Sequence, residues 1–190
     1  MRASKKLIGS TVLKASLSAA VMVAAIASSA AQAATQGTLG ATSTGTVTIT
    51  ASVPNRARIT GLSDVAFTNQ DPSIVASNAQ NACVWSNTAT KGYTVTATGN
   101  GAANAFTLAN AALTVPYSVQ WNATSGQTSG TALTTGAASA GLVSTATHQT
   151  CASGPATTSS LIVGISTVDL SSMQAAITYT GILTLVVTPQ

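Results

Sequence analysis

The stretch TGTVTITASVP, residues 44–54, has the clearest strand pattern near the start of the chain. Threonine or serine occupies every second position, and Pro54 ends the pattern. The positions between them are apolar, namely Val47, Ile49, Ala51 and Val53. Such an alternation, rich in β-branched residues, is typical of a strand with one buried face. We therefore predict a half-buried strand over residues 46–53, which must join a sheet in its own molecule or in a neighbour.

The first 33 residues have the parts of a secretory signal peptide. Basic residues come first, an apolar run rich in alanine and serine follows, and Ala31-Gln32-Ala33 offers a small-residue cleavage site. This order is typical of a leader that is removed on export. The alternative, a retained membrane anchor, fits less well, because serine and alanine dilute the apolar run. Cleavage after Ala33 leaves 157 of the 190 residues, enough for one domain with a full core.

Removal of the leader also removes most of the positive charge. The chain has 7 Lys and Arg against 3 Asp and Glu, a formal charge of +4, and four of the basic residues lie in the leader. The charged residues that remain are Arg56, Arg58, Lys91, Asp64, Asp71 and Asp169, which sum to zero. A neutral surface offers no basic patch for nucleic acid or anionic lipid. Near-zero charge favours association between molecules, and no apolar run after the leader is long enough for membrane insertion.

The chain has two cysteines, Cys83 and Cys151. Export places them in an oxidising compartment, where two cysteines admit one intramolecular pairing, so we predict that disulfide. A metal site is not expected, since two thiols without CxxC spacing and one histidine cannot supply four ligands. No cofactor is expected either.

Alternating or apolar stretches recur along the mature chain and predict an antiparallel β-sandwich. Residues 68–82, with Pro72, are predicted to form a loop, and no helical periodicity follows the leader. Trp121 continues the face of Val115 and Val119 and is predicted to be core, whereas Trp85 fits a core or a sugar-binding platform equally well. The predicted strands lie within 56–62, 64–67, 83–87, 92–101, 105–126, 131–135, 161–166 and 176–189.

The residues that could support catalysis are few. Glutamate is absent, and the aspartates at 64, 71 and 169 are best explained as loop residues that cap turns. A Cys–His nucleophile pair would need a free thiol beside His148, which the predicted disulfide consumes. The chain is therefore not expected to be an enzyme. Asn122-Ala-Thr124 matches the glycosylation sequon, but the leader is of bacterial character, so we expect the sequon to be idle.

Three segments together resemble the major subunits of alpha-type chaperone–usher pili, the colonisation-factor-antigen and cable-pilus kind. They are TVTITASV near the mature start, VPYSVQW in the middle and YTGILTLVVTP at the end, in that order. The segment before the first of them, residues 34–45, is longer here than in that family, and the two cysteines are not a general feature of it.

The resemblance implies a pilin-type, immunoglobulin-like β-sandwich over residues 54–190 that lacks its last strand. Residues 34–53 would be an N-terminal extension whose donor strand, 46–53, enters the groove of the next subunit. The donor residues would be Val47, Ile49, Ala51 and Val53, and the residues bordering the groove Tyr179, Leu183, Leu185 and Val187. The implied partners are other copies of the chain, a periplasmic chaperone and an outer-membrane usher. The implied location is an extracellular fimbria, which leaves room for a host or surface receptor.

Two other functions compete with a fimbrial subunit. A secreted adhesive or carbohydrate-binding module would use the same sandwich, with Trp85 and the polar loops as its contact surface. A secreted hydrolase is the more remote alternative, because the chain is so poor in carboxylates.

Overall fold

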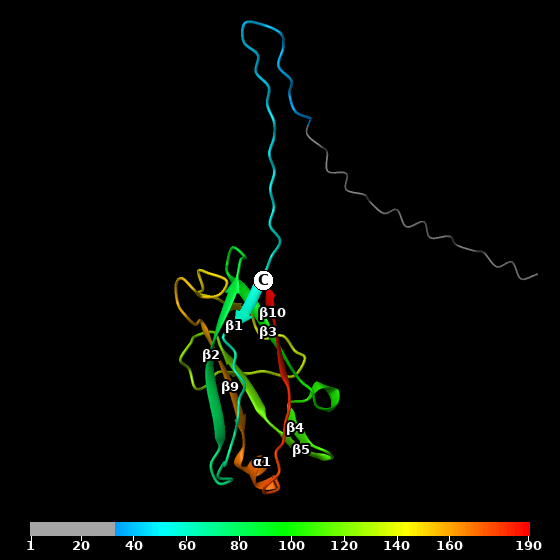
Figure 1. The fold of residues 1–190 in the computed structure, drawn as a ribbon, viewed down its shortest axis with the longest axis vertical. Helices are drawn as coiled ribbons and strands as arrows, with labels where there is room; N and C mark the ends of the chain where they lie inside the picture. Colours follow the sequence, from blue (N-terminus) through cyan, green and yellow to red (C-terminus); the bar gives the residue numbers. More distant parts are fainter. Residues whose placement is uncertain (1–32) are drawn as a thin grey trace, which may run out of the picture. The chain divides into compact units, whose positions relative to one another are not determined.

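The computed structural model describes residues 33–190 (Figure 1). The predicted signal peptide therefore lies outside the described residues, apart from Ala33. The chain divides into two units, one ending at Ala51 and the other running from Ser52 to Gln190. The strands of the described residues all belong to the second unit. Among residues 33–190, no helix has the length and apolar character that crossing a bilayer requires.

The second unit is an all-β fold of antiparallel strands, as predicted. One sheet has the strand order β1-β2-β9-β6-β7, a second has the order β10-β3-β8, and β4 and β5 form a two-stranded ribbon. Every strand pair is antiparallel. The strands are β1 (Ala57–Thr60), β2 (Ala76–Ser86), β3 (Gly92–Gly99), β4 (Thr107–Asn110), β5 (Leu113–Pro116), β6 (Ser118–Asn122), β7 (Thr131–Ala132), β8 (Leu142–Val143), β9 (Ser159–Ile165) and β10 (Leu183–Pro189); the helices are η1 (Ala102–Asn104) and α1 (Thr167–Ser172).

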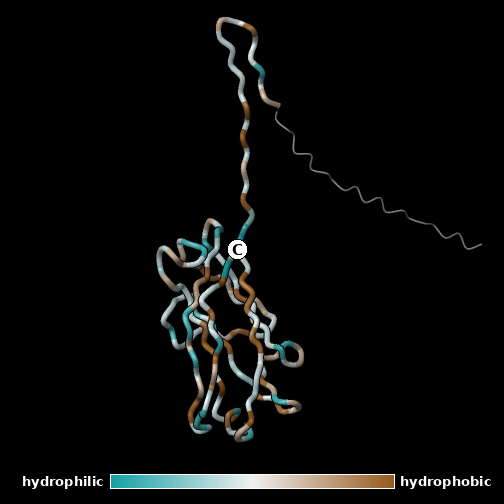
Figure 2. The backbone as a smooth tube through the Cα atoms, in the orientation of Figure 1, coloured by the Kyte–Doolittle hydropathy of each residue, from teal (hydrophilic) through white to brown (hydrophobic). Residues whose placement is uncertain are grey.

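The core draws its side chains from both larger sheets, and apolar residues recur along their strands (Figure 2). On β3, Tyr93, Val95 and Ala97 are fully buried, which matches the predicted inward face of that strand. Trp121 on β6 is buried as well, which confirms that it is a core residue. Its indole Nε1 donates a hydrogen bond to the hydroxyl of Tyr93 at 3.3 Å, and that hydroxyl lies 3.1 Å from Oγ of Ser159. The polar atoms buried here are thus paired.

Two parts of the prediction are wrong. Residues 76–82, assigned to a loop, form the first half of β2, because pairing with β9 from Ala76↔Ile165 to Ala82↔Ser159 holds them extended. Their side chains are alanine, serine, asparagine and glutamine, which show little strand propensity on their own. Helix α1 was not predicted either. Its six residues are too few to show helical periodicity, although Ser166 caps it by accepting a hydrogen bond from the backbone N–H of Asp169.

Two predicted strands are absent or shorter. Residues 64–67 belong to no strand, although Val65 and Phe67 pack against the core. The predicted strand over 176–189 begins only at Leu183, and before it Thr180 makes an isolated antiparallel bridge with Ala109.

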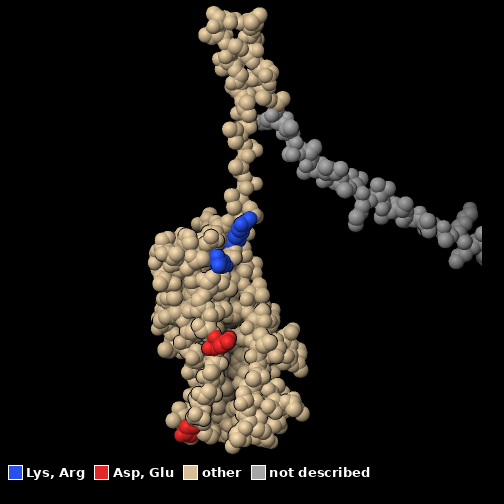
Figure 3. Space-filling view, in the orientation of Figure 1, with Lys and Arg blue, Asp and Glu red and all other residues tan. Residues whose placement is uncertain are grey.

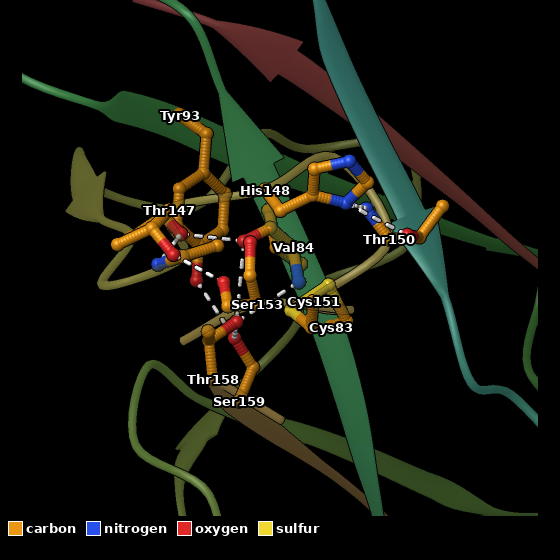
Figure 4. Close-up of a disulfide and its surroundings, with 12 residues drawn as sticks. Cys83, Val84, Tyr93, Thr147, His148, Thr150, Cys151, Ser153, Thr158 and Ser159 are labelled. Carbon is orange, nitrogen blue, oxygen red and sulfur yellow. Dashed lines mark hydrogen bonds between the residues drawn. A yellow bond between two sulfur atoms is a disulfide. The ribbon is translucent and has the colours of Figure 1, made fainter. Parts of the chain in front are cut away.

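The Cys83–Cys151 disulfide is formed, as predicted, with an S–S distance of 2.03 Å and a Cα–Cα distance of 6.1 Å (Figure 4). It joins β2 to the loop that precedes β9. Beside it, Oγ1 of Thr158 accepts a hydrogen bond from Val84 N at 2.9 Å, and Oγ of Ser144 donates one to Val84 O at 2.5 Å. The loop is therefore held to β2 by hydrogen bonds as well as by the disulfide.

Replacing each of two buried tyrosines by phenylalanine should have opposite effects on stability. Tyr93→Phe leaves Trp121 Nε1 without a partner and Ser159 Oγ with only Thr158 Oγ1 at 3.5 Å, and it should lower the free energy of unfolding by about 1–3 kcal/mol. Tyr117 differs, because among residues 33–190 its hydroxyl is the buried side-chain polar atom that lacks a hydrogen-bond partner. Tyr117→Phe should therefore be neutral or stabilising. Urea unfolding of both variants checks this, and a large loss in Tyr117→Phe would show that its hydroxyl is paired.

Tyr117 should also make the stability of the native protein fall at alkaline pH. Burial raises the pKa of Tyr117, so the folded state holds this proton more tightly than the unfolded chain does. The stability of the native protein is then unaffected by this group below about pH 10 and falls as the pH rises beyond that value. The fall should be shallower in Tyr117→Phe, as measured by unfolding between pH 8 and 11.

The disulfide makes a third prediction. Cys83 and Cys151 are 68 residues apart, and in the chain-entropy model closing such a loop adds about 4 kcal/mol to the free energy of unfolding. The double variant Cys83→Ser/Cys151→Ser should lose about that amount in urea unfolding. A reductant should destabilise the native protein but not the double variant. Two titratable thiols per denatured, oxidised chain would contradict the bridge.

Candidate functional site

The candidate site is the edge of β10 that has no partner. In the described chain, β10 pairs through one edge with β3, from Leu183↔Gly99 to Pro189↔Tyr93, and no strand pairs with its other edge. A β-edge of this kind presents a row of unpaired backbone N–H and C=O groups, to which another extended chain can add.

The inner face of β10 is incompletely covered. Its apolar residues Leu183, Leu185 and Val187 pack against the core but remain half-exposed, and the residues between them are exposed. By contrast, Val95 and Ala97 on the neighbouring β3 are fully buried. Burial therefore decreases from β3 to the free edge, which is expected where a covering element is missing.

Tyr179, which was expected to continue this face, does not belong to β10. It lies before the strand, is buried, and its hydroxyl accepts a hydrogen bond from Gln174 N at 3.2 Å. Its polar end is thus occupied within the chain. The structure places Leu183, Leu185 and Val187 on one strand and sets Tyr179 apart from them.

The second free edge belongs to β1. This strand pairs with β2 and forms the end of the five-stranded sheet. It lies beside β10, but no hydrogen-bonded ladder joins the two (Figure 1). Gly61, with φ of 83°, ends β1, and residues 61–75 belong to no strand. The edges of β1 and β10 therefore face each other without a backbone ladder, and residues 61–75 add no strand beside β10.

Residues 46–53 do not form the predicted strand within this chain. Only Thr46 is bridged, to Thr35, by backbone hydrogen bonds of 2.9 and 3.0 Å. The apolar alternation is visible along the segment in Figure 2. Val47 is 75%, Ile49 89% and Val53 76% exposed, and Ala51 is exposed too. An alternating pattern gives a half-buried strand only where a sheet edge accepts it, and the described chain supplies none at these residues.

The side chain of Asn87 holds the start of the second unit. Its Oδ1 accepts a hydrogen bond from Arg56 N at 2.6 Å, and its Nδ2 donates one to Pro54 O at 2.9 Å. The backbone N–H of Asn87 also donates to Arg56 O at 3.1 Å. Residues 54–56 are thus fixed beside the end of β2. The sequence offers no signal for this contact, because the partners are 31 and 33 residues apart.

The residues considered for catalysis lie on separate elements. Asp71 accepts hydrogen bonds from the backbone N–H and the hydroxyl of Ser73, which hold its pKa below the ordinary value. Asp169 accepts from the Ser166 hydroxyl at the start of α1, and His148 lies 2.9 Å from the Thr150 hydroxyl in the disulfide loop. Asp64 follows β1. Within residues 33–190, no three metal-ligating side chains come together.

The two tryptophans do not share a surface. Trp121 lies in the core, while Trp85 is half-buried against Cys83, Ala146 and Cys151. A sugar platform built from both rings is therefore excluded.

The chain matches no protein-family model and no curated protein sequence. Its function is accordingly inferred from the two open edges and the exposed alternating segment.

The Asn87 contact predicts protease sensitivity. Asn87→Ala removes both side-chain hydrogen bonds to residues 54–56, so the Arg56–Ala57 bond should be cut by trypsin several-fold faster, because cleavage requires local opening. Mass spectrometry of the fragment ending at Arg56 measures the rate. Asn110→Ala is the control, since the same substitution there removes a side-chain hydrogen bond to Thr178 O, away from residues 54–56. Equal rates in the native protein and Asn87→Ala would contradict the contact.

Proposed function

We propose that this chain is a structural subunit of an extracellular fimbria that polymerises by strand donation. Residues 46–53 of one copy would add to the open edge of β10 in the next. A single observation supports this most strongly. The same chain has a free strand edge with half-exposed apolar residues and an extended segment whose alternating apolar residues are exposed.

The two partners agree in length and chemistry. β10 has seven residues, as does the segment 47–53, and seven extended residues span about 23 Å. Val47, Ile49 and Val53 are exposed in the chain alone. Burying them with Ala51 would contribute about 5–9 kcal/mol gross, before the backbone ladder is counted. This is enough to favour a stable joint.

An antiparallel orientation fits best. Every ladder of the fold is antiparallel, and antiparallel pairing is slightly more stable per residue. Val53 would then lie beside Leu183. In this orientation the chain cannot offer the strand to its own β10, because Asn87 fixes residues 54–56 at the far end of β10 from Leu183, and three residues reach only about 11 Å. The contact is therefore between copies, and a head-to-tail contact that does not close gives a fibre.

The composition of β10 also supports an edge that another chain covers. Soluble proteins guard free edges with charged residues, bulges or prolines within the strand, whereas LTLVVTP has no charge and only a terminal proline. Such an edge would aggregate unless it were covered. In the resembled pili the cover is first a periplasmic chaperone and then, at an outer-membrane usher, the next subunit. We propose the same partners here, with an immunoglobulin-like fold completed by the donated strand.

The strand donor is tested by two matched substitutions. Ile49→Asp places a carboxylate in the apolar contact, which costs several kcal/mol and should abolish fibres in electron micrographs. Thr50→Asp adds the same charge to the opposite face and should still polymerise. A synthetic peptide of residues 44–54 should raise the melting temperature of the monomeric Ile49→Asp chain, because a ligand of the folded state stabilises it.

Two results would overturn the proposal. Normal fibres from the Ile49→Asp chain would show that this face is not buried between copies. A melting temperature that does not respond to the peptide, although the chain is folded, would show that the β10 edge does not accept the segment.

A further inference from the structure

The six charged residues of the second unit are separated by sign along the strands. We define the basic end as the end at which β1 and β3 begin and β2 and β10 finish. Arg56 and Arg58 lie there, since Arg58 pairs with Trp85, and Lys91 lies in the turn before β3. Figure 3 shows basic side chains at this end and acidic ones farther down the same face.

The opposite end carries acidic residues. Asp71 lies in the loop before β2, and Asp169 lies on α1, directly after β9. The two strands meet here, because Ala76 pairs with Ile165. We call this the acidic end. Asp64 lies between the ends, since its neighbour Ser63 bonds the Gln80 side chain halfway along β2.

These charges are available to a partner. Arg56, Arg58 and Asp71 are exposed and Asp169 is half-buried, and among residues 33–190 none of the six charged side chains forms an ion pair. The hydrogen bonds from Ser73 keep Asp71 ionised at neutral pH.

We infer that the basic end of one copy docks on the acidic end of the next, as a second contact in the fibre. This inference rests on the proposed strand donation. With residues 47–53 seated antiparallel on β10, Val53 lies beside Leu183, at the end of β10 that points away from the basic end of the receiving copy. Residues 54–56 reach at most about 11 Å from there, so the donor's own basic end lies on the acidic side of the receiving copy. The Debye length is about 10 Å at 0.1 M salt and about 30 Å at 0.01 M, so at low salt the opposite charges attract across this joint.

The same charges select the orientation of the joint. A donor strand running parallel to β10 would place Val53 at Pro189, so that two basic ends would face each other and repel. Charge complementarity of this kind acts mainly on the rate of association and on the exclusion of wrong geometries. The charge pattern thus distinguishes productive addition from addition in the wrong direction.

The first test needs no variant. Fibre growth of the mature chain, followed by light scattering, should slow about tenfold between 20 and 500 mM NaCl, because salt screens steering by exposed charges.

The second test uses charge variants. The variant Arg56→Glu/Arg58→Glu should grow about tenfold more slowly than the native chain at 20 mM NaCl. Adding Asp71→Lys and Asp169→Lys to it exchanges the signs of the ends and should restore growth to within about twofold. Asp64→Asn is the control and should match the native chain.

The outcomes distinguish the charged contact from the strand donation on which it rests. If the native chain forms fibres, but growth ignores salt and the double variant grows normally while folded by circular dichroism, the charged contact is wrong and strand donation stands. Failure of the fourfold variant to recover, although folded, overturns the contact as well. If the native chain forms no fibre at any salt concentration, both proposals fall.

Discussion

The free backbone edge of β10 is the constraint from which the rest of the structure can be understood. A strand has hydrogen-bonding groups on both edges, and β10 satisfies one of them through seven residue pairs with β3. Its inner face is half-exposed for the same reason, since the apolar side chains at a sheet edge need a neighbour on each side. The unpaired backbone and the incompletely covered side chains therefore have the same cause, the lack of a neighbouring strand, and a single added strand would pair the one and cover the other.

The fold tolerates this opening because it is secured elsewhere. On the far side of β2, the disulfide and the hydrogen bonds of Ser144 and Thr158 to Val84 tie the loop before β9 to the five-stranded sheet. In the interior, Trp121, Tyr93 and Ser159 form a paired polar network between the sheets. These contacts do not depend on the open edge.

Prediction from sequence succeeded where the information is local. The buried faces of β3 and β6 follow from alternating β-branched and aromatic residues, β9 follows from a short apolar run, and two cysteines allow one disulfide. The method failed at residues 76–82, whose small and polar side chains become a strand only because β9 pairs with them. The sequence pattern could not reveal the Asn87 contact, because its partners are 31 and 33 residues away along the chain. For residues 46–53 the pattern predicts a strand that the described chain by itself does not form.

The position of β1 has a mechanical consequence. In a fibre joined through residues 47–53, a pull on the extension enters the domain at Ala57 and leaves through the receiving edge of β10. The four residue pairs between β1 and β2 would then be loaded together, in shear, and the last of them is Thr60↔Cys83. Because Cys83 is covalently bound to Cys151, tension that reaches this point spreads at once into a second segment of the domain. In such a fibre the disulfide would lie at the far end of the loaded ladder, where it would stop a stretched subunit from unravelling further.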